Sequence, residues 1–189
     1  MEKKIKILTL SDHPMSPSGV AHQTKAMIQG LLDPHPDKYE FVCLGGAIKH
    51  DRYEPVQVEP EKYGQGTWTI IPVDGYGNPD IIRSVLRTEK PDILWFMTDP
   101  RFYGWLWEME NEIRSAVPMI YYHVWDNYPA PHFNKIWYDS NDVVVSISKV
   151  TSDIVRNVSP EVKERYLPHA VNTDIFRKIS DPNLIAFKE

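Results

Sequence analysis

The sequence contains a single cysteine, Cys43, among 189 residues. One cysteine excludes an intramolecular disulfide and a zinc site built from cysteines. Long apolar runs are also missing, because no run approaches the ~20 residues that span a bilayer. The first five residues, Met1 to Ile5, lack the apolar stretch of a secretory signal. We therefore expect no transmembrane segment and a cytoplasmic protein.

The sequence also lacks an excess of basic residues. The chain has 21 Lys and Arg against 26 Asp and Glu, which gives a formal net charge of −5. This balance offers no electrostatic reason to bind nucleic acid, so no nucleic-acid partner is expected. What the sequence does have is 42% hydrophobic and 12% aromatic residues. That composition builds a core and excludes a disordered chain.

Short apolar runs alternate with amphipathic stretches along the whole chain, which is typical of a parallel α/β sheet. The runs are nearly continuous rather than alternating, which indicates strands covered on both faces. We predict one Rossmann-like, doubly wound α/β domain with a mostly parallel sheet of about six or seven strands and helices on both faces. The predicted strands are 5–10, 39–44, 67–73, 93–97, 118–122, 143–147 and a short one at 165–167.

Capping residues place the helices between these strands. Ser18 is suited to cap the first helix, which Asp33-Pro34 ends, and Asn78-Pro79 begins the next. The spacing of apolar residues predicts a helix at about 102–114 with Phe102 on its inner side, and a short helix at 133–140. Ser148 is predicted to cap a further helix that buries Val150, Ile154, Val155 and Val158. Residues 47–66 are predicted to form an irregular surface excursion.

Polar residues gather where the predicted strands end, and ligands of such sheets bind at the carboxyl ends of the strands. His13, His123, His132 and His169 all fall in or near loops on that edge. His123 is the strongest candidate, because it leaves a buried strand directly into the expected cleft and could orient or deprotonate a hydroxyl there. Asp126 follows as its partner or as an acceptor of sugar hydroxyls. The alternative for each residue is a purely structural role.

The start of the first helix offers a second kind of site. Ser18 and Gly19 present free amides and the positive end of the helix dipole, which suit a phosphate. The alternative is a simple cap. No Gly-x-Gly-x-x-Gly follows the first strand and no Walker A motif occurs, so a dinucleotide or NAD enzyme is the weaker hypothesis. No His pair stands at ligand spacing on a helix, and no metal is expected.

Three segments together resemble one family. ILTLSDHP and PSGVAHQT, at 7–14 and 17–24, resemble the opening of retaining glycosyltransferases of the GT-B fold, family 4. SISKVTSDI at 146–154 is similar to that family's strand-to-helix segment. YLPHAVNTDIF at 166–176 resembles the xIPNGVDxxxF signature at the end of its N-terminal domain, with His169 and Ala170 in place of Asn-Gly.

The resemblance implies a function and residue roles. The family transfers a sugar from a nucleotide-sugar to an acceptor hydroxyl with retention, usually without a metal, and the donor is a substrate rather than a cofactor. Gly19 would place its amide near the donor's diphosphate or transferred sugar, and Ser18 and His13 are also expected to bind substrate. His123 would contact the sugar near the reacting centre as the catalytic residue. Asp126 and Asn127 would line the acceptor side, and His169 is also expected to bind substrate.

By this resemblance, we expect the family's second domain, which binds the nucleotide, to be absent from this chain. We expect an acceptor-side domain over residues 1–178 and the start of a linker or tail over 179–189. The donor domain would then come from a partner chain or a homo-oligomer, and the acceptor would be a glycan, lipid or small molecule. The alternatives are a non-catalytic sugar- or acceptor-binding module and a subunit of a split enzyme.

Overall fold

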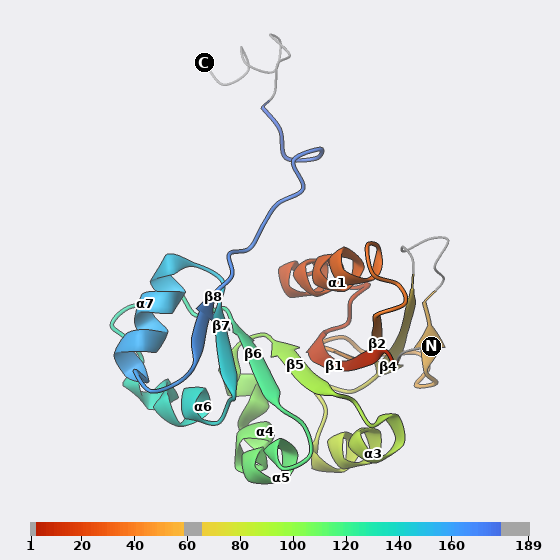
Figure 1. The fold of residues 1–189 in the computed structure, drawn as a ribbon, viewed down its shortest axis with the longest axis horizontal. Coiled ribbons are helices and arrows are strands. Elements are labelled where there is room, and N and C mark those ends of the chain that lie inside the picture. The colour runs from red at the N-terminus through yellow and green to blue at the C-terminus, as the bar shows by residue number, and fades with distance from the viewer. Residues whose placement is uncertain (1–2, 59–65, 179–189) are drawn as a thin grey trace.

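A computed structural model describes residues 3–58 and 66–178, which form an eight-stranded sheet with helices on both faces (Figure 1). The strand order is β3-β4-β2-β1-β5-β6-β7-β8, and every pair is parallel except the antiparallel β3–β4 pair. The doubly wound α/β fold is therefore confirmed. The strands are β1 (Ile5–Asp12), β2 (Tyr39–Gly46), β3 (Val56–Gln57), β4 (Thr67–Pro72), β5 (Ile93–Met97), β6 (Met119–His123), β7 (Val143–Ser146) and β8 (Glu164–Tyr166).

The helices follow the predicted caps. Ser18 accepts a hydrogen bond from Ala21 N, and Asn78 accepts from the amides of Asp80 and Ile81. No helix in the described part is both long and apolar enough to cross a membrane. The helices are α1 (Gly19–Leu32), α3 (Pro79–Glu89), α4 (Gly104–Glu108), α5 (Glu110–Arg114), α6 (Lys135–Asp139) and α7 (Lys149–Val158), with 3₁₀ turns at Pro100–Tyr103 and His132–Asn134.

The sheet separates two apolar cores. On one face, Ile28 and Leu32 of α1 pack with Phe41, Trp68 and neighbouring strand residues. On the other face, buried residues of α3, α4, α5, α6 and α7 join a larger cluster. Figure 1 shows α1 on one side of the sheet and α3 to α6 on the opposite side. This division follows from the chain's direction, because right-handed crossovers place helices on opposite faces when the strand order reverses.

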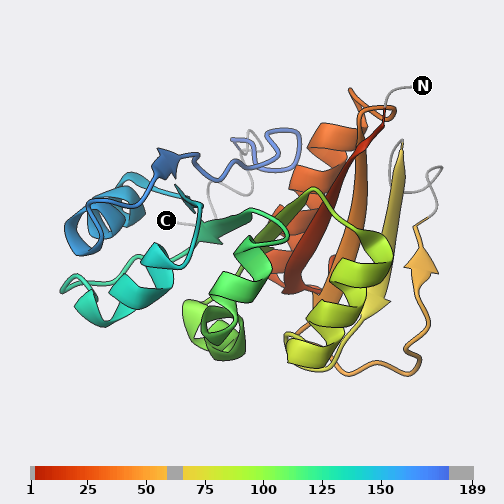
Figure 2. The ribbon, with the colours of Figure 1, turned by 60° about the horizontal axis from the view of Figure 1, so that its bottom comes forward.

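The reversal occurs between the two central strands. From β1 the chain adds β2 and β4 on one side, and then returns to β5, which pairs with β1 through Leu10 opposite Phe96. The segment after β8 runs back across this edge toward α1 (Figure 2), where Gln23 Nε2 donates to Ala170 O at 3.2 Å. The carboxyl edge of β1 and β5 is therefore the position where such sheets bind ligands.

Three local predictions were wrong. The helix expected at 102–114 is a 3₁₀ turn followed by α4 and α5, with a break at Met109. The break lets Trp107 and Ile113 both reach the core, although six positions of a straight helix would place them about 120° apart around the helix axis. Phe102 is 53% exposed and Val150 is also exposed, where both were expected inside.

The predicted surface excursion is not wholly irregular. The excursion at 47–66 contains a short strand, β3, that pairs with β4 and was not predicted. The predicted linker or tail at 179–189 lies outside the described residues.

Candidate functional site

A hydrogen-bonded network stands at the reversal of strand order. Asp12 is the last residue of β1, and its buried carboxylate accepts two hydrogen bonds. Ser18 Oγ donates to Oδ2 at 2.5 Å, and the Tyr76 hydroxyl donates to Oδ1 at 2.9 Å. Because Ser18 Oγ also accepts from Ala21 N at 3.0 Å, the network joins β1 to the first turn of α1 and to the loop before α3.

The start of α1 is open to solvent beside this network. Gly19, the first residue of the helix, is exposed, and a Cβ there would touch nothing within 4 Å. The amides of this first turn and the positive end of the helix dipole are features that bind anions. The structure thus brings Ser18 and Gly19 together with Asp12 at one edge of the sheet.

His13 lies on the β2 side of the same edge. Its Nδ1 accepts from Met15 N at 3.2 Å, so the neutral ring carries its proton on Nε2. Gly45 makes room for the ring, because a Cβ at Gly45 would come within 2.7 Å of His13 Cδ2. Partial burial and the nearby His50 ring, at 5.5 Å, lower the pKa of His13. Sequence reasoning did not find His50, because no motif marks it.

His123 does not enter a cleft, which corrects the expected position of its side chain. The residue is 0% exposed, and its Nε2 lies 2.6 Å from the Tyr138 hydroxyl. The Tyr138 hydroxyl also accepts from Asn134 Nδ2 at 3.1 Å, whereas Nδ1 of His123 has no partner in the described part of the chain. Burial lowers the pKa of His123 to about 3, and the charge of Asp99 opposes this shift only in part.

The other predicted site residues are spread along the edge. Asp126 and Asn127 are exposed in the loop after β6, where the Trp125 indole donates to Asn127 O at 3.1 Å. His169 is half-buried, with its ring 5.2 Å from that of Tyr122, and burial lowers its pKa. His132 is exposed in the 3₁₀ turn before α6.

Tyr76 is a part of the site that sequence reasoning missed. Thr98, directly after β5, is buried at φ 151°, a backbone conformation that is rare for a β-branched residue and is found at functional sites. The signal that could have found Tyr76 is its pair of flanking glycines, Gly75 and Gly77, which both have positive φ. Gly46 is needed beneath this loop, because a Cβ there would lie 2.1 Å from Gly75 O.

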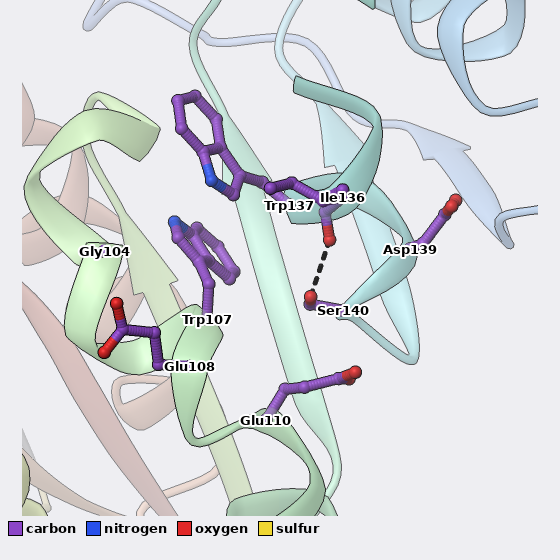
Figure 3. A pocket seen from close by; sticks show the side chains of 8 residues that line it. All are labelled: Gly104, Trp107, Glu108, Glu110, Ile136, Trp137, Asp139 and Ser140. Atoms are coloured by element: carbon purple, nitrogen blue, oxygen red, sulfur yellow. Dashed lines mark hydrogen bonds between the residues drawn. The ribbon is translucent and has the colours of Figure 1, made fainter. Parts of the chain in front are cut away.

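A separate cavity of about 510 Å³ lies between α4–α5 and α6 (Figure 3). Trp107 and Trp137 line it, together with the carboxylates of Glu108, Glu110 and Asp139. None of the predicted site residues contributes to this cavity. Within the described ranges, no group of three or more His, Cys, Asp or Glu side chains is placed to hold a metal ion.

Comparisons with known proteins bear on the fold. No family model matches the sequence, and no curated protein matches it. Trehalose-6-phosphate synthase from E. coli, bound with UDP-2-fluoro glucose, has a similar structure, with TM-score 0.55 and 11% identity over 97% of this chain. Trehalose-6-phosphate synthase from Burkholderia multivorans matches with TM-score 0.48 and 10% identity over 92% of this chain.

The likeness to the E. coli structure bears on the fold alone. The chain has the Rossmann-like α/β fold found in GT-B glycosyltransferases. It spans 54% of the E. coli structure and 50% of the Burkholderia structure, and therefore about half of the length of each.

Proposed function

We propose that this chain is the acceptor-side domain of a retaining glycosyltransferase of family 4, which transfers a sugar from a nucleotide-sugar to an acceptor hydroxyl. The observation that carries the proposal is the Asp12–Ser18–Tyr76 network, which fixes the open start of α1 at the reversal of strand order. The fold likeness to an enzyme bound with UDP-2-fluoro glucose and the resemblance of residues 166–176 to the family signature support it.

The predicted residues take roles in this proposal according to their positions. Ser18 and Gly19 receive the donor's diphosphate, since amides and the helix dipole favour negative charge there. His13 borders the same edge. Asp126 and Asn127 are exposed and available to acceptor hydroxyls. His123 is assigned to the transferred sugar, and it reaches a ligand only if its buried surroundings open, because the side chain is 0% exposed.

A second domain completes the proposed enzyme. The chain spans about half of the structure it resembles, and we assign the nucleotide to a further domain, in the same protein or in a partner chain. Catalysis requires both substrates in one closed cleft, so this chain by itself is expected to turn over negligibly. The nucleotide-sugar is a substrate, and the proposal includes no metal or other cofactor.

The test is a titration of the ¹⁵N-labelled chain with UDP-glucose and GDP-mannose. We expect amide shifts at residues 18–20 with a dissociation constant weaker than about 1 mM, which corresponds to about 4 kcal/mol of binding free energy. The start of α7 at Ser148 and Lys149 is the matched control, because it is also a serine-capped helix start on the same edge. Micromolar binding would contradict the need for a donor domain, and the absence of shifts at 18–20 would contradict the donor position.

The buried state of His123 favours a second candidate, a binding module that holds a sugar or an acceptor without transferring it. A histidine whose Nε2 is bonded to Tyr138 and whose pKa is about 3 does not act as a base in this conformation. Adding a donor domain distinguishes the two functions. Transfer that disappears in the His123→Ala variant supports the enzyme, whereas saccharide binding without transfer supports the module.

A further inference from the structure

Phe102 is an exposed aromatic side chain at the reversal of strand order. It lies in the 3₁₀ turn that follows β5, and it is 53% exposed. The Tyr76 ring stacks on it with a centroid distance of 4.7 Å and an interplanar angle of 24°. One face of the Phe102 ring is therefore covered by a parallel partner while the residue remains open to solvent.

Contacts of Tyr76 with the rest of the site hold this stacked pair in place. The Tyr76 hydroxyl is bonded to Asp12, which Ser18 bonds in turn, and the buried Tyr103 ring contacts Tyr76 edge-on at 5.8 Å. A ring that the fold already orders loses little conformational entropy when a ligand stacks on it. An exposed apolar ring that is fixed in this way is suited to binding rather than to core packing.

Arg101 precedes Phe102 in the same 3₁₀ turn and brings a charged group to it. The Arg101 guanidinium donates to both carboxylate oxygens of Asp99, at 2.8 and 2.6 Å, and lies 5.8 Å from the Trp125 ring. Two of its five N–H groups are used in this pair, and Arg101 is exposed, so other donors remain for a ligand. The next residues after Trp125 are the exposed Asp126 and Asn127.

The charges around Arg101 select against an anionic acceptor. Asp99 neutralises Arg101, and the exposed Asp126 follows Trp125, whose ring lies beside the Arg101 guanidinium. A negatively charged acceptor would meet like charges there, whereas an uncharged polyhydroxyl compound would meet hydrogen-bond donors and acceptors.

We propose that the Phe102–Tyr76 pair is the platform on which the acceptor stacks, and that the acceptor is an uncharged pyranoside. A pyranose ring has a face of C–H groups and a rim of hydroxyls. These match a flat aromatic ring on a sheet edge that also carries Arg101, Asp126 and Asn127. This inference rests on the proposed function, and it names the chemical class of the acceptor.

Saturation-transfer NMR of the purified chain tests the platform with methyl glycosides of glucose, galactose and mannose. We expect a neutral glycoside to bind with its ring C–H protons closest to the protein. Phe102→Ala is expected to weaken this binding about tenfold, and Phe102→Trp to preserve it. Phe176→Ala removes another exposed phenylalanine ring, away from the platform, and is expected to leave binding unchanged.

Three results would overturn the platform. They are the absence of binding by any of the neutral glycosides, unchanged binding in Phe102→Ala, and tighter binding of methyl glucuronoside than of methyl glucoside. Amide spectra of each variant establish that the fold is intact. A failure of the platform is distinguishable from a failure of the proposed function. Glycoside binding without transfer beside a donor domain contradicts only the proposed glycosyltransferase activity, and transfer that is insensitive to Phe102→Ala contradicts only the platform.

Discussion

Two polar networks occupy the same edge of the sheet, and they differ in access. Asp12 ends β1 and His123 ends β6, and each bonds the hydroxyl of a tyrosine. Both oxygens of Asp12 are satisfied, and the partners Tyr76 and Ser18 are half-buried. His123 and Tyr138 are both fully buried, and His123 Nδ1 is left without a partner among the described residues. A strand-end position therefore brings a side chain to the edge without opening it to ligands.

The covering element explains the difference. Asp12 follows Leu8 and Leu10 at alternate positions of β1, and His123 follows Met119 and Tyr121 in the same way on β6. Both side chains therefore point to the face that holds the larger core. At β1 a short loop carrying Tyr76 covers that face, while at β6 the helix α6 covers it with Tyr138. The difference between loop and helix decides which network a ligand can reach.

The largest expected effect concerns the buried network of His123 and Tyr138. The folded chain keeps His123 neutral down to pH about 3, whereas the unfolded chain binds a proton below pH 6.5. Acid therefore favours the unfolded chain, and the free energy of unfolding falls by about 1 kcal/mol for each pH unit across that interval. The groups beside the ring are Asp99, which opposes the effect in part, and the neutral phenols of Tyr121 and Tyr138.

Urea unfolding over this pH range measures the slope in the wild type and in His123→Gln. The substitution removes the titrating group, so the free energy of unfolding of His123→Gln is expected to fall less steeply as the pH is lowered. The altered packing adds a constant offset to this free energy and leaves the slope unchanged. His22→Gln, on the exposed side of α1, is the control and should keep the wild-type slope. Equal slopes in the wild type and His123→Gln would show that His123 is not held neutral.

A smaller effect on stability is expected where Gly46 contacts the loop that carries Tyr76. In Gly46→Ala the new Cβ would lie 2.1 Å from the carbonyl oxygen of Gly75, and backbone must move to relieve the contact. We expect a loss of about 3 kcal/mol in the free energy of unfolding, together with weaker ordering of Tyr76. Gly30→Ala, inside α1 where a Cβ meets nothing, is the control and should gain about 0.5–1 kcal/mol. Similar changes in both variants would refute the close approach.

The smallest expected effect concerns the stability that the two serine helix caps contribute. Ser18 and Ser148 both cap a helix by accepting from the amide three residues later, at 3.0 Å in each case, but only Ser18 bonds a carboxylate. We expect Ser148→Ala to cost about 1 kcal/mol and Ser18→Ala about 2 kcal/mol, because the latter also removes a charge-assisted bond. Thermal unfolding of both variants measures the difference. Equal losses would mean that the bond to Asp12 adds no stability.

Much of the fold was predictable from the sequence. The seven parallel strands, the caps at Ser18, Asn78 and Ser148 and the order of the elements follow from local signals that neighbouring residues carry. The helix at 102–114 was not predictable as it is, because its break at Met109 serves the burial of Trp107 and Ile113 together. That requirement comes from the packing of the whole layer.

The candidate site was predictable only in part. The loop after β1 and the start of α1 stand next to each other in sequence, so Asp12, Ser18 and Gly19 were brought together by local signals. Tyr76 comes from a loop more than sixty residues away, and it meets Asp12 because Gly46 lets that loop approach β2. No local pattern marks such a contact.

The sequence by itself determined where the parallel strands lie, to within about two residues at their ends. Through the two-residue repeat of a strand, it also determined which face each side chain points to. Only the tertiary structure decided whether that face is open. Tyr138 of α6 encloses His123, while the stacked rings of Tyr76 and Phe102 leave the edge beside Asp12 accessible. The physical reason is that periodicity is a property of neighbouring residues, whereas burial depends on elements that the chain brings together from far apart.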